Sequence, residues 1–143
     1  MRKFTKKFMV LAVAALALAV VALPAQAAKP SPCVPHAVSY QVSGTLTVAG
    51  SLTAGSSKGT YNGSLTVKVT RTNSGAEADK GLTKTYTLTN VRVSFGHGVS
   101  KTAPAAGSRV NVKGTITREP TSCTGFTPTL TVKKVELLAA KKK

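Results

Sequence analysis

The side chains that most often carry catalysis or metal binding are scarce in this chain. Its 143 residues include two cysteines, two histidines and four acids, against 20 lysines and arginines. Cys33 and His36 form one close pair, and with the later His97 and Cys123 they could hold a tetrahedral metal ion. Their spacing matches no standard zinc motif, so we expect no metal and no other cofactor.

Catalytic constellations are also not expected. A nucleophile needs a base beside it, but His36 lies in an N-terminal leader and His97 in a Gly-His-Gly turn. Glycoside hydrolysis needs two carboxyl groups that face one cleft, and a calcium or magnesium cage needs several. The acids are dispersed as Glu77, Asp79, Glu119 and Glu136. We therefore expect that the protein is not an enzyme.

The first 27 residues have the layout of a secretory signal peptide. They comprise the cations Arg2, Lys3, Lys6 and Lys7, the apolar run Phe8–Leu23 and the small-residue site Pro24-Ala25-Gln26-Ala27. A spanning helix needs roughly 20 apolar residues, so we expect a helical signal peptide, cleavage after Ala27 and no transmembrane anchor after processing. The mature protein is then secreted, extracellular or in the cell envelope, and its Ala-rich signal is typical of bacteria.

Export changes the expected chemistry of the two cysteines. An oxidising compartment favours a disulfide between Cys33 and Cys123 over a metal site. This bond would tie the N-terminus to a loop late in the chain. Closing such a long loop stabilises a fold by about 4 kcal/mol in the chain-entropy model.

Alternation of apolar and polar residues with period two predicts β-strands beyond the leader. The first runs from Val38 to about Ala54, with a bend at Gly44 or Gly50 and Val48 among its inward side chains, and Gly55–Gly59 forms the next turn. The other strands are expected at Thr60–Thr70, Thr83–Phe95, Ser108–Arg118 and Thr129–Leu138. Shifts of parity at Thr89-Asn90 and Lys133-Lys134 predict β-bulges, and Gly114 marks a bend. Asn73–Gly81 is expected to be a loop.

Each expected strand has one dry face, so the sheet must close on itself or pack on a second sheet. The simplest solution is an all-β, five-stranded small barrel, and the alternative is an antiparallel β-sandwich. The expected organisation is a signal peptide (1–27), an extended leader (28–37), a barrel (38–138) and a basic tail (139–143).

Two segments strengthen the barrel prediction. Gly107–Ile116 has the pattern G-x-x-V-x-V-x-G, and Leu130–Val135 has the pattern L-x-V-x-x-V. They resemble the last two strands of an OB-like barrel, and the chain is similar to small exported bacterial OB-like proteins of unknown function. The resemblance implies a five-stranded barrel and supplies no catalytic residue. The helix that such barrels commonly place between the third and fourth strands has no counterpart in Gly96–Gly107.

The charge balance points to an anionic partner. Without the four signal cations, 16 basic residues face 4 acids, a formal charge of +12, which favours contact with an anionic cell-wall polymer or another polyanion. The cations at outward positions, which we expect to bind it, are Lys68, Arg92, Arg109, Lys113 and Lys133. The run Lys141–Lys143 is either a solubilising tail or a further anionic contact.

Nucleic acid is a weaker candidate because single strands need exposed aromatic platforms. The inward parities hold Tyr40, Tyr61, Tyr86 and Phe95, and only Phe126 lies in a loop. We therefore expect a secreted, non-catalytic binding module for an anionic envelope polymer. The alternative is a passive structural or protein-interaction domain that binds a partner by strand addition at an open edge.

Overall fold

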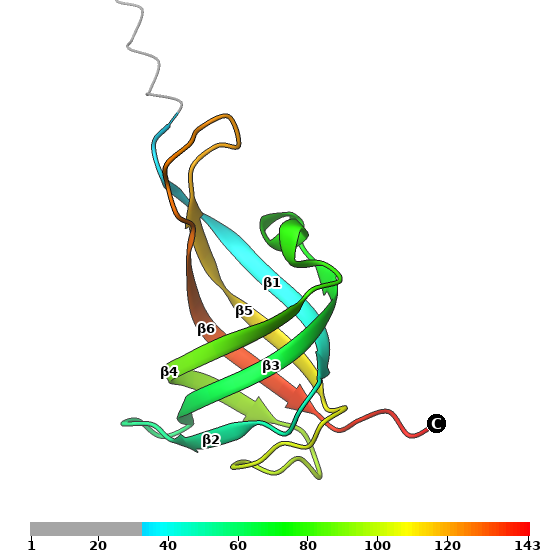
Figure 1. Cartoon of the computed structure of the whole chain (residues 1–143). Coiled ribbons are helices and arrows are strands. Elements are labelled where there is room, and N and C mark those ends of the chain that lie inside the picture. The colour runs from blue at the N-terminus through cyan, green and yellow to red at the C-terminus, as the bar shows by residue number, and fades with distance from the viewer. Residues whose placement is uncertain (1–32) are drawn as a thin grey trace, which may run out of the picture. The chain divides into compact units, whose positions relative to one another are not determined.

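The computed structural model describes residues 33–143, which form a small β-barrel (Figure 1). Its elements are β1 (His36–Leu46), β2 (Ser51–Ala54), β3 (Thr60–Thr72), the 3₁₀ helix η1 (Ser74–Asp79), β4 (Thr83–Phe95), β5 (Arg109–Arg118) and β6 (Thr129–Leu138). The predicted signal peptide and the start of the predicted leader lie outside the described residues. The last two leader residues, His36 and Ala37, belong to β1.

The sheet closes on itself. The strand order is β1-β5-β6-β4-β3, β3 pairs back onto β1, and β2 is appended to β3. Every pairing is antiparallel except that of β4 with β6, which is parallel. This is the OB-like five-stranded barrel that the sequence predicts, with one extra strand, and it excludes the sandwich alternative.

Alternating residues of all the strands fill the barrel. Tyr40 and Tyr86 are each 1% exposed, and the valines and leucines of the same parity surround them. Tyr61 and Phe95 are half-buried against this core, and their rings meet edge to face at 5.0 Å. The four aromatic side chains that were expected to point inward therefore belong to the core or pack on it.

Both predicted bulges are present. On β4, Thr89 and Asn90 together face Asn62, because Tyr61 pairs with Val91 and Gly63 with Leu88. Asn62 Oδ1 accepts the Asn90 backbone N–H at 2.7 Å. On β6, Lys113 pairs with Lys134 and Gly114 with Val132, which leaves Lys133 as the extra residue. A bulge shifts the alternation by one residue, and this explains both parity shifts in the sequence.

The first predicted strand is two strands. β1 ends at Leu46 and β2 begins at Ser51, and both pair with the same edge of β3, through Leu46–Val67 and Ser51–Ser64. The residues between them leave the sheet, so Val48 is 54% exposed rather than inward. Just before β2, the Gly50 N–H donates to the carbonyl of Pro104, a residue of the Gly96–Gly107 connection, at 2.8 Å.

The loop predicted at Asn73–Gly81 contains η1. Gly75 and Ala76 of η1 are buried, and a Cβ at Gly75 would collide with the Ser39 carbonyl of β1. A helix of six residues is too short to show an apolar period, so the sequence pattern missed it. The connection Gly96–Gly107 holds no helix, as expected. Among residues 33–143, no helix is long and apolar enough to cross a membrane.

Candidate functional site

The five predicted cations lie outside the barrel in two groups. The first group straddles β1: Lys68 on β3 and Arg109 on β5 both pair with Thr45. Both side chains are exposed. Lys68 Nζ donates to the Gly81 carbonyl at 2.6 Å, and Arg109 Nε donates to the Ala139 carbonyl at 3.1 Å.

The second group spans β4, β6 and β5. Arg92 of β4 and Lys113 of β5 both pair with Lys134 of β6, and Lys133 is the bulged residue beside it. Arg92 and Lys133 are exposed, and Lys113 is half-buried. Lys134, which was not predicted, thus completes this row.

A shallow groove runs along the outside of β1, and we call it the β1 groove. It consists of two adjoining hollows that share Ser43 and Arg71, of about 430 and 260 Å³. The larger hollow extends to Arg109 and Lys141, and the smaller one to Asn73. Of the five predicted cations only Arg109 lines this groove.

An irregularity in strand pairing builds the β1 groove. Ser43 pairs with Arg71 and Gly44 with Val69, so Thr70 is an extra residue on β3. Thr70 Oγ1 donates to the Ser43 carbonyl at 3.1 Å. A Cβ at Gly44 would collide with the Lys68 carbonyl, so the close approach of β1 and β3 requires glycine here.

The same bulge explains why sequence analysis missed Arg71. The predicted strand ended at Thr70, whereas β3 continues to Thr72. Strict alternation would also have placed Arg71 on the inner side with Val67 and Val69. The extra residue turns Arg71 outward to face solvent beside Ser43.

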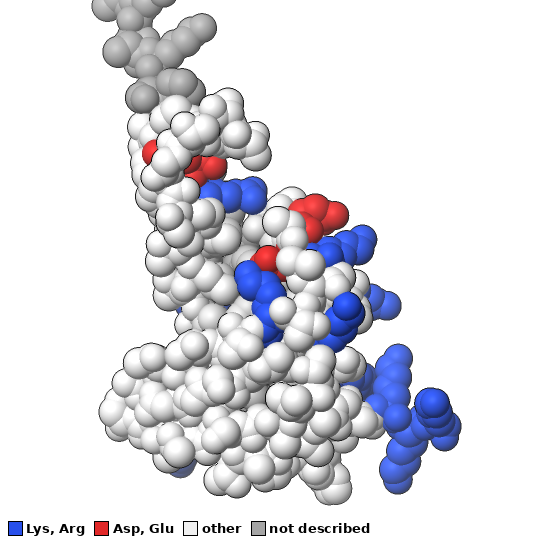
Figure 2. Space-filling model, in the orientation of Figure 1, with Lys and Arg blue, Asp and Glu red and all other residues white. Residues whose placement is uncertain are grey.

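The lining of the β1 groove carries positive charge and no acid. Its cations are Arg71, Arg109 and Lys141, and its floor has hydroxyl and amide groups. Ser43 Oγ donates to Asn111 Oδ1 at 2.6 Å. In the view of Figure 2, Lys and Arg gather on the side of the barrel toward the C-terminus, whereas few charged atoms are visible around β2.

Two acids lie next to this lining without being part of it: Thr72 Oγ1 donates to Glu77 Oε2 at 3.2 Å, and Glu136 pairs with Asn111. Within residues 33–143 the ion pairs are Lys84–Asp79 and Lys134–Glu136, each 3.0 Å between nitrogen and oxygen. The hydrogen bond from Lys134 is the main cause that lowers the pKa of Glu136. Neither pair includes a cation of the β1 groove.

A second polar cluster lies inside the barrel beneath η1. Tyr40 donates its hydroxyl to Asp79 Oδ2 at 2.6 Å, and the Tyr86 hydroxyl lies 2.8 Å from that of Tyr40. Lys84 Nζ donates to Asp79 Oδ1 at 3.0 Å. Because the Tyr40 proton is directed at the carboxylate, Tyr86 donates to Tyr40. Burial is the main cause that raises the pKa of both tyrosines. Their burial makes this cluster part of the core rather than a ligand site.

Comparison of the chain with protein-family models, with curated proteins and with solved structures found no match in any of the three. The OB-like character of the barrel therefore rests on strand order and pairing.

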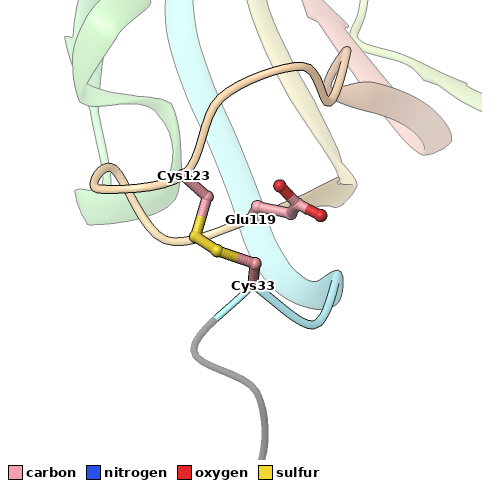
Figure 3. A group of neighbouring side chains, drawn as sticks. All are labelled: Cys33, Glu119 and Cys123. Carbon is pink, nitrogen blue, oxygen red and sulfur yellow. A yellow bond between two sulfur atoms is a disulfide. The ribbon is translucent and has the colours of Figure 1, made fainter.

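The predicted disulfide is present (Figure 3). Cys33 and Cys123 are bonded, with their Cα atoms 5.6 Å apart and 90 positions between them in sequence. Glu119 lies close enough for its carboxylate and the two sulfurs to form a compact group, but bonded sulfurs are not thiolate ligands. The Cys2His2 set is not assembled either. His97 follows β4, whose last residue Phe95 pairs with Leu137 at the end of β6, whereas Cys123 precedes the start of β6.

Proposed function

We propose that this protein is an exported, non-catalytic binding module whose cationic outer surface contacts an anionic polymer of the cell envelope. The proposal depends on one observation: within residues 33–143, the groove cations Arg71, Arg109 and Lys141 form no ion pair, and hydroxyl groups of Ser43 and Thr70 lie beside them. Uncompensated charge of one sign attracts polyanions and raises their association rate.

Two features support export. The first 27 residues have the layout of a signal peptide. The Cys33–Cys123 disulfide is typical of proteins from oxidising, extracytoplasmic compartments. The protein is then a small exported OB-like barrel of the bacterial type.

The distribution of aromatic side chains favours a polymer without bases. Tyr40 and Tyr86 are buried, and Tyr61 and Phe95 pack on the core. Single-stranded nucleic acid gains about 1–3 kcal/mol per base from stacking on exposed rings, and the β1 groove has no aromatic residue in its lining.

The test is a salt titration of polymer binding. The processed, oxidised protein is immobilised, and an acidic polysaccharide is applied at increasing NaCl, with neutral dextran as the control. Because exposed charges are screened beyond about 8 Å at physiological ionic strength, the affinity should fall steeply with salt and dextran should not bind. Binding that ignores salt, or that is equal for dextran, contradicts the proposal.

A second candidate is a protein-interaction domain, and one observation favours it. The backbone edge of His36–Val38 that faces away from β5 has no strand partner among residues 33–143. An extended peptide could add there as a strand. In that case Ala37→Pro, which changes the backbone of this edge, should abolish partner capture, while loss of the five outward cations should leave capture intact.

A further inference from the structure

We infer that the β1 groove is where the polymer binds, and that its ligand is an acidic polysaccharide, whose repeat carries both carboxylates and free hydroxyls. This inference rests on the proposed function, since it assigns that binding to one place on the barrel. It shifts the expected contacts from the five predicted cations to Arg71, Arg109 and Lys141.

The first argument is the placement of the two arginines. Arg71 pairs with Ser43 from the β3 side, and Arg109 pairs with Thr45 from the β5 side. Neighbouring strands are about 4.8 Å apart, so strands on either side of β1 are about 10 Å apart. Each guanidinium can take one carboxylate with two hydrogen bonds. The two arginines therefore start from backbone positions about a nanometre apart, and a polymer with repeated anionic groups can contact both of them at once.

The second argument is the chemistry of the groove floor. Ser43 Oγ donates to Asn111 and Thr70 Oγ1 donates to the Ser43 carbonyl. With their protons directed at the protein, both oxygens present lone pairs as acceptors. The floor therefore suits a ligand that supplies O–H donors between its charges, which sugar hydroxyls provide and bare polyphosphate does not.

The third argument is shape and charge. The groove follows β1 from Gln41 to Thr45, and four residue steps of a strand measure about 13 Å. No acid lines it, and Lys141 adds a cation at the end nearest the C-terminus.

The test compares two triple variants of the processed, oxidised protein. Arg71→Gln, Arg109→Gln and Lys141→Gln remove the groove cations. Arg92→Gln, Arg118→Gln and Lys133→Gln remove the same number of arginines and lysines outside its lining. Polygalacturonate is the probe, and inorganic polyphosphate and oligo(dT) are the comparison polymers. Thermal melting and thiol titration check that each variant is folded and oxidised.

The groove variant should bind polygalacturonate at least about tenfold more weakly than the parent, which corresponds to about 1.4 kcal/mol of binding free energy. The matched variant should bind it within about threefold of the parent. Equal losses in both variants overturn the groove assignment but leave the proposed function standing. A parent protein that binds no polyanion in a salt-dependent way overturns the proposed function itself. Tighter groove-dependent binding of polyphosphate or oligo(dT) than of polygalacturonate overturns the ligand class.

A second measurement needs no substitution. Phenylglyoxal modifies exposed guanidinium groups, and mass spectrometry locates the modified residues. Bound polygalacturonate should protect Arg71 and Arg109 several-fold more than Arg92 and Arg118. Uniform protection, or none, contradicts the assignment.

Discussion

The inner and outer faces of β1 differ in whether the charged side chains beside them have partners of opposite charge. On the inner face, the Tyr40 hydroxyl and the Lys84 ammonium group both donate hydrogen bonds to the Asp79 carboxylate. No buried side-chain polar atom within residues 33–143 lacks a hydrogen bond. On the outer face, Ser43 lies between Arg71 and Asn111 in a groove whose lining contains no acid. The inner charges serve the fold because each is compensated. Within residues 33–143 the cations of the β1 groove have no ion-pair partner, so they remain available to a ligand.

The largest expected effect comes from the residue that supports both faces. Gly44→Ala places a methyl group against the Lys68 carbonyl, and forcing extra volume into a packed site typically costs about 1–3 kcal/mol and occasionally more. We expect a large loss of unfolding free energy together with loss of polymer binding. Denaturant melts and the polymer titration measure the two. Unchanged stability would show that β1 and β3 can separate at this bulge without cost.

Tyr40→Phe tests whether the stability supplied by the inner face is independent of polymer binding on the outer face. Removing the hydroxyl leaves Asp79 without one donor and Tyr86 without its acceptor, which should cost about 1–3 kcal/mol. Polymer affinity should stay at the parental value. Tyr61→Phe is the matched control, because the Tyr61 hydroxyl makes no side-chain hydrogen bond within residues 33–143, and it should lose little stability. Loss of binding in the Tyr40 variant would mean that the faces are coupled.

Alkaline pH tests the inner cluster without substitution. Burial raises the pKa of Tyr40 and Tyr86 above the ordinary value of about 10. The unfolded chain therefore releases these protons first, and stability should fall as pH rises above about 10, by about 1.4 kcal/mol per unit for a tyrosine that ionises only when unfolded. Urea melts between pH 8 and 11 measure the slope, which should be shallower in Tyr40→Phe. Identical slopes would contradict the role of burial.

The smallest effect is expected at the outer ion pair. Lys134 lowers the pKa of Glu136. The ion pair therefore stabilises the fold at pH values above the usual pKa of a glutamate, and this stabilisation is lost as the pH falls through the lowered pKa of Glu136. Exposed pairs of this kind contribute about 0.2–1 kcal/mol. Lys134→Gln should therefore change stability at pH 7 by less than Tyr40→Phe does. A larger loss would place Lys134 among the residues that hold the barrel together.

Features of this fold that depend on neighbouring residues could be predicted from the sequence, whereas features that depend on contacts between distant residues could not. The strands Thr83–Phe95 and Thr129–Leu138 were predicted with the observed bounds, because alternation and its shifts are local signals. The outward cations Arg92 and Lys133 followed from the same parity. Arg71 did not, because its direction depends on a bulge against a strand far away in sequence.

The inner cluster shows the same limit. Tyr40 and Asp79 are 39 positions apart, and the turn that carries Asp79 is too short to have a periodic pattern. The predicted disulfide, in contrast, needed no geometry, since the described chain has two cysteines and both are in it.

The disulfide also sets an order of events. A chain that emerges N-terminus first exposes Cys33 long before Cys123, which follows 90 positions later. Cys123 lies between β5 and β6, and Cys33 immediately precedes β1. The two sulfurs meet in the native bond because β1 pairs with β5, which places the residues before β1 next to the residues after β5, with His36 opposite Arg118. The native bond of this protein is thus a late step of its maturation, and it links the two ends of the β1–β5 pair covalently.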